Sequence, residues 1–486
     1  MANRRLFLMP SVRPGTRLPA QIRDTIRRSV LAGQLRPGSQ LPSSRALASE
    51  LGVSRNSVVD AYDQLLVEGY LESRRGSGTF VAPHVAARAS RWPTVDRPAA
   101  SRTSVFGLAL AEITTSHSSD ALRPFSPGIP ALEPSLLRRW IQTSGRVRRR
   151  ITPELLNYGD AAGYGPLREA IASRLGPTRG VTCGPDQVVI TSGTQQGLAI
   201  AAQLLCNPGD TAWIEDPGYP GAAAAFAAAG ARLAHVPVDS EGIRVASGVR
   251  RAPSARLAYV SPSHQYPLGV TTTLPRRLEL LQWAEENDAW ILEDDYDSEF
   301  RYDGRSLPAL QGLDRRGRVL YLGTFSKTLF PSLRIGYVIV PPSLGPAFAK
   351  AVSVAGHGPP LIEQAVLHRF IETGSYTRHL RQMRRIYAER NAAFCEGIHR
   401  RLGRVLRFHG EAMGLHVACE LLSEEDDRRI SERAAAAGLS LPALSSYFGG
   451  PRPKRGFVMG YGHLTTLQIR SGIAALSELL RTIARS

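Results

Sequence analysis

LRPGSQLPSSRALASELGVSRNSVVDAYDQLLVEGYLESRRGSGTFV, residues 35–81, is the stretch that decides the fold of the N-terminal part of this chain. The serines near Ser44 predict the cap of a helix, which ends at the glycine-containing turn of residues 52–54. Apolar residues at helical spacing predict a following helix over about residues 55–68 and an earlier one over residues 21–31. Two helices joined by such a tight turn are typical of a helix-turn-helix.

A hairpin is expected after these helices. Residues 70–73 and 79–81 flank Arg74-Arg75-Gly76-Ser77-Gly78, which predicts a wing with a basic tip. The second helix of a helix-turn-helix places its first residues in the major groove of DNA. The alternative is a helical bundle whose arginines are simply solvated.

The stretch resembles the winged helix-turn-helix of the GntR family. The resemblance implies DNA contacts at Arg45, Arg55 and Gly78. Together with the groove-facing residues and the basic wing, the residues expected at DNA are Arg45, Ser54, Arg55, Asn56, Ser57, Arg74, Arg75 and Gly78.

Composition divides the 486 residues into three regions. Residues 16–82 are predicted to form the winged helix-turn-helix, and residues 83–120, rich in Ala, Ser, Pro and Arg, a linker. Residues 121–486 alternate short β-branched runs with helical patterns, which predicts an α/β domain with a mainly parallel sheet.

Charge and cysteine content restrict the class of protein. The formal net charge of +18 favours an acidic partner such as nucleic acid, although a generally arginine-rich composition is the alternative explanation. The four cysteines form no C-x-x-C pair, so neither a disulfide framework nor a metal site is expected. We expect no membrane segment and no secretory signal, and a cytoplasmic location.

Lysine is scarce, because only Lys327, Lys350 and Lys454 occur among 60 basic residues. Arginine pairs with anions as well as lysine does, but it cannot act as an amine nucleophile. Lys327 ends the run Gly323-Thr324-Phe325-Ser326-Lys327, and Arg334 follows seven residues later. Hydroxyls and a guanidinium at this spacing predict a phosphate site beside a lysine able to form a Schiff base.

Three further segments suit a flat, phosphorylated pyridine cofactor. Asp294, in the acidic run of residues 293–297, could pair with a ring nitrogen. The alternative is a surface acidic turn, which is plausible for Asp295 and Asp297 and less so for Asp294. The turn of residues 191–197 precedes a helical pattern and could bind phosphate. Tyr219 lies in a proline-rich turn and could stack on the ring, or simply pack.

Together these segments resemble fold-type I aminotransferases over residues 121–486, with further matches at residues 158–168 and 467–472. The resemblance implies pyridoxal phosphate held by Lys327, a smaller C-terminal α+β subdomain, and a head-to-tail homodimer. Tyr158 would approach the phosphate of the partner subunit, and Arg470 would clamp the carboxylate of a ligand. The implied cofactor contacts are Asp294, Tyr296, Tyr219, Thr194, Gln195, Thr324, Ser326, Arg334 and Tyr158.

A GntR-type reader fused to such a domain resembles the MocR/GabR family of regulators, as does the run SPSHQ at residues 261–265. The two-residue spacing of Asp294 and Tyr296, where the enzymes usually show three, also resembles the regulators. Leu268 departs from the enzymes' common Thr in this turn, which leaves the local ligand contacts open. The resemblance implies a regulator, not an enzyme, that binds double-stranded DNA at two half-sites and senses an amino compound or pyridoxal phosphate itself. The alternative is a working aminotransferase with an attached DNA-binding domain.

Overall fold

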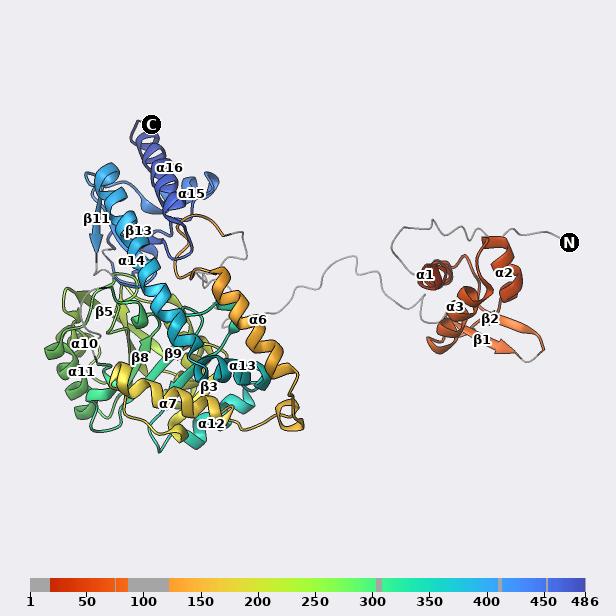
Figure 1. Cartoon of the computed structure of the whole chain (residues 1–486), viewed down its shortest axis with the longest axis horizontal. Helices are drawn as coiled ribbons and strands as arrows, with labels where there is room; N and C mark the ends of the chain where they lie inside the picture. The colour runs from red at the N-terminus through yellow and green to blue at the C-terminus, as the bar shows by residue number, and fades with distance from the viewer. Residues whose placement is uncertain are drawn as a thin grey trace. The chain divides into compact units, whose positions relative to one another are not determined.

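The computed structural model describes residues 18–74, 76–85, 122–302, 308–409, 413–451 and 453–485. The chain divides into two compact units, Met1–Thr103 and Ser104–Ser486 (Figure 1). Arg75, predicted at the wing tip, lies outside the described residues, and so does the predicted linker from residue 86 onwards.

The N-terminal unit has the predicted order of elements. They are α1 (Leu18–Leu31), α2 (Ser44–Leu51), α3 (Arg55–Val67), β1 (Leu71–Arg74) and β2 (Gly78–Val81). Ser43 caps α2 by accepting from Ala46 N, and Ser54 caps α3 by accepting from Ser57 N, each at 3.2 Å. Gly52 ends α2 with a φ of 65°, a conformation that glycine adopts without strain. β1 and β2 form the antiparallel hairpin of the wing.

One apolar core holds the three helices and the hairpin together. Ile22, Ile26 and Val30, spaced by four residues on α1, are buried as the helical spacing requires, whereas Leu66 of α3 is only partly buried. Burial of this continuous core supplies the main stabilisation of a unit this small.

The large unit is built on an eight-stranded sheet with the order β3-β10-β9-β8-β7-β4-β5-β6. The five central strands β9, β8, β7, β4 and β5 are parallel, while β10 and β6 pair antiparallel with their neighbours. The strands are β3 (Val188–Thr191), β4 (Thr211–Asp216), β5 (Arg232–Asp239), β6 (Gly242–Ile243), β7 (Leu257–Val260), β8 (Trp290–Asp295), β9 (Val319–Thr324) and β10 (Gly336–Ile339).

Helices bury both faces of this sheet, as the apolar strand sequences require. Val189 of β3 packs with α8, α9 and α12, whereas its neighbours Val188 and Ile190 pack with α7 and α13 on the other face. The helices are α6 (Pro134–Arg148), α7 (Gly165–Arg179), α8 (Thr194–Leu205), α9 (Pro220–Ala228), α10 (Val245–Arg251), α11 (Leu274–Glu286), α12 (Gly345–Val354) and α13 (Leu361–Glu372).

A smaller α+β subdomain ends the chain, as predicted. Its antiparallel sheet, β11 (Leu406–His409), β12 (His416–Leu421) and β13 (Gly456–Gly460), packs with α14 (Ser375–Leu402), α15 (Asp427–Ala436) and α16 (Thr466–Arg485) around a separate core. Within the described part of the chain, no helix is both long and apolar enough to cross a membrane.

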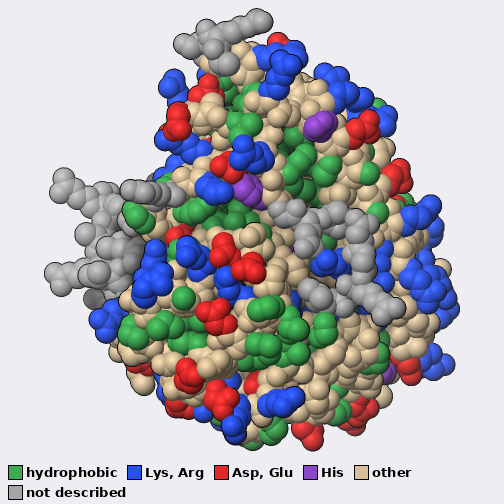
Figure 2. Space-filling view, turned by 90° about the vertical axis from the view of Figure 1, so that its left-hand side faces the viewer, with side chains coloured by type: hydrophobic (Ala, Val, Ile, Leu, Met, Phe, Trp, Pro, Cys, Tyr) green, Lys and Arg blue, Asp and Glu red, His purple; other side chains and the backbone are tan. Residues whose placement is uncertain are grey.

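The positive charge of the chain is not gathered into a patch on the face of the large unit seen in Figure 2. Lysine and arginine side chains lie interspersed with acidic ones across this face. This distribution is typical of an ordinary solvated surface, so on this face the net charge alone does not indicate a nucleic-acid site.

Candidate functional site

A cavity of about 400 Å³ lies at the carboxyl ends of the central parallel strands, where ligands of α/β proteins bind. It gathers side chains that follow β3, β4, β8 and β9, which are far apart in the sequence. The predicted residues that line it are Thr194, Gln195, Tyr219, Asp294, Tyr296, Thr324, Ser326, Lys327 and Arg334.

Lys327 extends into this cavity from the loop after β9. Its Nζ donates to the carbonyl of Gly128 at 2.9 Å. Burial lowers the pKa of the ammonium group, and the carboxylates of Asp297 and Asp294 oppose that shift. A lowered pKa increases the fraction of free amine, which is the form that attacks a carbonyl carbon. Lys327 is therefore suited to hold an aldehyde cofactor.

Asp294, at the end of β8, has one carboxylate oxygen without a partner. Oδ2 accepts from the hydroxyl of Tyr259 at 2.8 Å, while Oδ1 is buried and has no hydrogen-bond partner among the described residues. Burial raises the pKa of this carboxyl to about 7. A protonated ring nitrogen would satisfy Oδ1, so the residues present fit the pyridine ring of pyridoxal phosphate.

An anion site lies at the start of α8. Gly193, with a φ of 83°, exposes the first N–H groups of the helix to the cavity, and a side chain at this position would meet Arg334 at 3.5 Å. Arg334 donates to the carbonyl of Ser192 at 3.0 Å. The helix N-terminus, the guanidinium and the hydroxyls of Thr324 and Ser326 together suit a phosphate dianion.

Two tyrosines predicted at the cofactor ring also line the cavity. The hydroxyl of Tyr219 lies 3.5 Å from Oε1 of Gln195, and burial raises its pKa to about 12. The hydroxyl of Tyr296 lies 3.1 Å from Nδ1 of His264, and burial raises its pKa too. Both phenols therefore keep their protons at neutral pH, but stacking by Tyr219 and donation by Tyr296 stay predictions.

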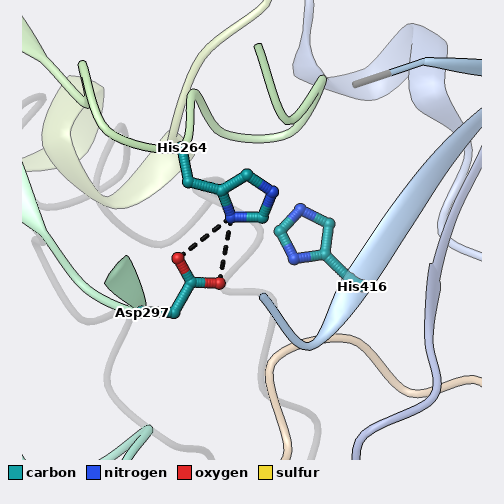
Figure 3. A group of neighbouring side chains, drawn as sticks. All are labelled: His264, Asp297 and His416. Atoms are coloured by element: carbon teal, nitrogen blue, oxygen red, sulfur yellow. Dashed lines mark hydrogen bonds and ion pairs between the residues drawn. The ribbon is translucent and has the colours of Figure 1, made fainter. Parts of the chain in front are cut away.

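The acidic run of residues 293–297 is not a surface turn. Asp295 is buried, paired with Arg179 at 2.7 Å, and accepts from the hydroxyl of Tyr321 at 2.7 Å. Asp297 is 1% exposed, and its two oxygens lie 2.9 and 3.0 Å from Nδ1 of His264 (Figure 3). The surface interpretation of both residues is therefore wrong, because each carboxylate has a buried basic partner from another segment.

Sequence reasoning missed several residues at the cavity. Asp297, Gly128, Tyr259 and His416 all line it. His416 starts β12 of the C-terminal subdomain, and burial lowers its pKa to about 3. Only the run SPSHQ, which supplies His264, gave a local signal for this region.

His264, Asp297 and His416 form a buried group whose ligand atoms lie within 4.8 Å of one another (Figure 3). Two imidazoles and a carboxylate are a donor set that could hold a transition metal. The sequence predicted no metal site, since these three residues are scattered over more than 150 positions.

Two predicted site residues lie away from the cavity. Tyr158 is 79% exposed, and its ring stacks on His357 with centroids 5.3 Å apart, so its role toward a partner subunit stays a prediction. Arg470 is exposed on α16 and is not among the lining residues. Because α16 buries Ile469 and Ile473 on its inner face, Arg470 points to solvent, and its predicted role as carboxylate clamp of this cavity is wrong.

The residues predicted at DNA lie on the exposed ends of α2 and α3 and on the wing. Arg45, Arg55 and Asn56 are exposed, and Arg55 reaches Ser44 at 3.5 Å, which places the starts of both helices side by side. The hydroxyls of Ser54 and Ser57 bond each other at 2.8 Å, and the hydroxyl of Ser54 also accepts from the backbone N–H of Ser57. In this structure the two side chains therefore serve the start of α3.

The exposed wing carries two further predicted DNA contacts, Arg74 and Gly78. Arg74 pairs with Glu72 at 2.6 Å and lies over the ring of Phe80. Gly78 has a φ of 108°, and a side chain there would meet Gln40 at 2.8 Å. The positive φ explains a glycine at this position, because other residues adopt it only with strain, while the contacts to DNA stay predictions.

Comparison with known proteins gives the same two parts. Residues 18–81 match the bacterial regulatory proteins of the gntR family, and residues 128–413 match the aminotransferases of class I and II. The probable rhizopine catabolism regulatory protein MocR of Rhizobium meliloti is 41% identical over 466 residues, which are 96% of this chain and 94% of that protein.

A second relative is the HTH-type pyridoxine biosynthesis transcriptional regulator PdxR of Corynebacterium glutamicum, 33% identical over 95% of this chain and 96% of that protein. Among solved structures, the alpha-aminoadipate aminotransferase LysN of Thermus thermophilus, complexed with N-(5'-phosphopyridoxyl)-L-leucine, superposes with a TM-score of 0.69. It is 27% identical and covers 79% of this chain and 96% of its own.

Proposed function

The chain belongs to the MocR-type family of transcription regulators, in which a GntR-type DNA-binding domain precedes an aminotransferase-like domain that binds pyridoxal phosphate, and we propose that it works as a sensor. The proposed signal is a primary amine that binds at the cofactor, or the cofactor itself. Occupancy of the cavity then alters the affinity of the N-terminal domain for its operator, as a coupling of two binding free energies.

The observation that carries this proposal is the pairing of Lys327 with an unsatisfied Asp294 in one cavity. Lys327 would hold the cofactor, Oδ1 of Asp294 would accept from its ring nitrogen, and Arg334 with the start of α8 would hold its phosphate. When bound, pyridoxal phosphate supplies an electrophilic carbon to which a primary amine can attach.

A sensor is favoured over a working aminotransferase by two observations. The two relatives described above are named as regulators. In addition, Arg470, the residue expected to clamp a carboxylate, is exposed on α16 and does not line the cavity. Turnover of an amino acid and an oxo acid by the purified chain at rates of about 1 per second or more would refute the sensor proposal.

We further propose that the regulator is a homodimer with one DNA-binding domain per subunit. Large apolar side chains are exposed along residues 132–158 of the large unit, and a partner would cover them. They are Leu132, Leu137, Ile141, Leu156 and Tyr158. A dimer of this kind fits an operator with two half-sites.

The test compares Lys327→Ala with Lys350→Ala, an exposed lysine on α12 that serves as the matched control. Each purified variant is mixed with pyridoxal phosphate, and its visible absorbance after gel filtration and its affinity for fluorescent operator DNA are measured. We expect Lys327→Ala to lose the absorbance and the cofactor-dependent change in affinity, while Lys350→Ala keeps both. Retention of both properties by Lys327→Ala would refute the assignment.

A further inference from the structure

We propose that the amine recognised at this cavity is a hydroxylated amine without a carboxylate, and that Asp297 and His416 select it. The inference rests on the proposed function, because it assumes that an amine attaches at the cofactor. It concerns the cavity wall next to Lys327, which Gly128, Asp297, Leu415 and His416 line.

This wall adjoins the position where the amine reacts. The Nζ of Lys327 is 2.9 Å from the carbonyl of Gly128. The charge of Asp297 raises the pKa of Lys327 more than that of Asp294 does, and the charge of Lys327 in turn lowers the pKa of His416. Asp297 and His416 line the same cavity as Lys327, so they face a group attached to the reacting amino group.

The described part of the wall offers no cation to a carboxylate. Among the described residues that line the cavity, Arg334 is the one guanidinium, and it lies at the start of α8 beside Ser192, where the phosphate would bind. The amine of Lys327 is itself the point of cofactor attachment. A ligand carboxylate beside Asp297 would then be a like-charge pair away from bulk water, which is unfavourable.

The same wall has free hydrogen-bond acceptors. The carboxylate of Asp297 can accept about four hydrogen bonds; Nδ1 of His264 supplies one N–H, leaving lone pairs for the cavity. His416 donates from Nε2 to the carbonyl of Pro267 at 3.2 Å, so its Nδ1 carries the lone pair in the neutral ring. Acceptors without a cation suit a ligand that donates, such as one with hydroxyl groups (Figure 3).

The packing behind Asp297 fixes this arrangement. Gly414, with a φ of 73°, lies so close that an added Cβ would be 2.4 Å from Oδ2 of Asp297 and 2.4 Å from Cε1 of His264. The hydroxyl of Tyr461 donates to the carbonyl of Gly414 at 2.9 Å, which holds the loop in place. Rigid acceptors of this kind discriminate strongly between ligands, because a wrong ligand leaves them buried and unpaired.

The experiment uses the full chain loaded with pyridoxal phosphate and two pairs of amines, serinol with serine and ethanolamine with glycine. The two compounds of each pair have the same amino group and differ in one position, where the amino alcohol has a hydroxymethyl group and the amino acid has a carboxylate. Binding is followed by the shift in visible absorbance and by the rise in Tm. We expect each amino alcohol to bind at least about tenfold more tightly than its amino acid.

The variant Asp297→Asn removes the charge but keeps the shape of the side chain. We expect it to abolish most of the preference for the amino alcohol, while Asp186→Asn, a change at a fully exposed carboxylate, leaves the preference intact. Equal or tighter binding of serine and glycine by the unchanged chain would overturn the proposal but not the sensor function. Micromolar binding of Zn²⁺ that Asp297→Asn abolishes would also overturn it, since the group would then be a metal site.

The outcomes separate this inference from the function on which it rests. If the chain shows no cofactor absorbance, both fail. If the absorbance is present and each amino acid binds more tightly than its amino alcohol, only the proposed selection by Asp297 and His416 fails.

Discussion

The substitution Asp294→Asn should stabilise the cofactor-free chain and weaken the cofactor-loaded one. Burial raises the pKa of Asp294 from 3.8 to about 7, so the folded cofactor-free chain resists ionisation of this group. When the pKa of a carboxyl group is higher in the folded chain than in the unfolded chain, the free energy of unfolding falls as the pH rises from the lower pKa to the higher one. The penalty is about 1.6 kcal/mol at pH 5 and about 4 kcal/mol at pH 8, from about 1.4 kcal/mol for each pH unit.

An asparagine has no such ionisation, so the advantage of the variant should grow by about 2 to 3 kcal/mol between pH 5 and pH 8. Acids whose pKa shift does not depend on Asp294, such as Glu299, titrate in both proteins and cancel from the difference. The assay is the Tm of both cofactor-free proteins across this pH range, followed by the same measurement with saturating pyridoxal phosphate.

The cofactor should raise the Tm of the unchanged chain more than that of the variant, because only a carboxylate can neutralise a protonated ring. Asp186→Asn, at an exposed carboxylate, is the control and should leave both curves unchanged. Identical pH dependence of Tm in the variant and the unchanged chain would refute the assignment of a raised pKa to Asp294.

Three further predictions follow from the same geometry. Gly128→Ala places a methyl group 2.7 Å from Nζ of Lys327 at a φ of 70°, so we expect loss of visible absorbance after cofactor addition with less than about 3 kcal/mol of destabilisation. Arg55→Ala should weaken operator binding about five- to a hundredfold and flatten its salt dependence, as fluorescence anisotropy at several salt concentrations would measure. Ser54→Ala removes the cap of α3 and should lower the stability of the N-terminal unit by about 1 kcal/mol, seen in urea unfolding; an unchanged unfolding curve would contradict the capping role.

The sequence predicts best those features that short segments determine. The helix-turn-helix follows from caps at Ser43 and Ser54 and from a glycine turn, all of which act within a few residues. Lys327 was predicted because lysine is scarce and because hydroxyls and Arg334 flank it, and Asp294 because it lies in an acidic run after a short apolar segment. In the fold both follow parallel strands, and a sheet brings such ends together. These predictions needed no knowledge of the tertiary contacts.

Features made by distant segments were not predictable. The environment of Asp297 depends on His264 and on Gly414 of the C-terminal subdomain, more than 100 residues away. The wrong prediction for Arg470 has a similar cause, since only the packing of Ile469 and Ile473 decides which face of α16 is turned inward. The direction in which a helical side chain points depends on the residues against which the helix packs. The spacing of a motif does not identify those residues.

Two possible signals, the cofactor and an amine, act on different parts of the cavity. Glu215 and Asp294 are both buried with pKa values raised to about 7, and the charge of Asp294 contributes to the shift at Glu215. Binding of a positively charged ring at Asp294 therefore changes the charge state of this pair, which an exchange of amines at Lys327 does not. An amine instead changes the surroundings of Asp297 and His416.

The operator response can therefore identify the signal. If the cofactor alone is sensed, Asp294→Asn should abolish the cofactor-dependent change in DNA affinity while Asp297→Asn leaves it nearly intact. If an amine is sensed, Asp297→Asn should remove the amine-dependent change even though the cofactor remains bound and coloured. A response that survives both substitutions would mean that neither group of contacts couples the cavity to DNA binding, because coupling requires a ligand to interact differently with the two states of the protein.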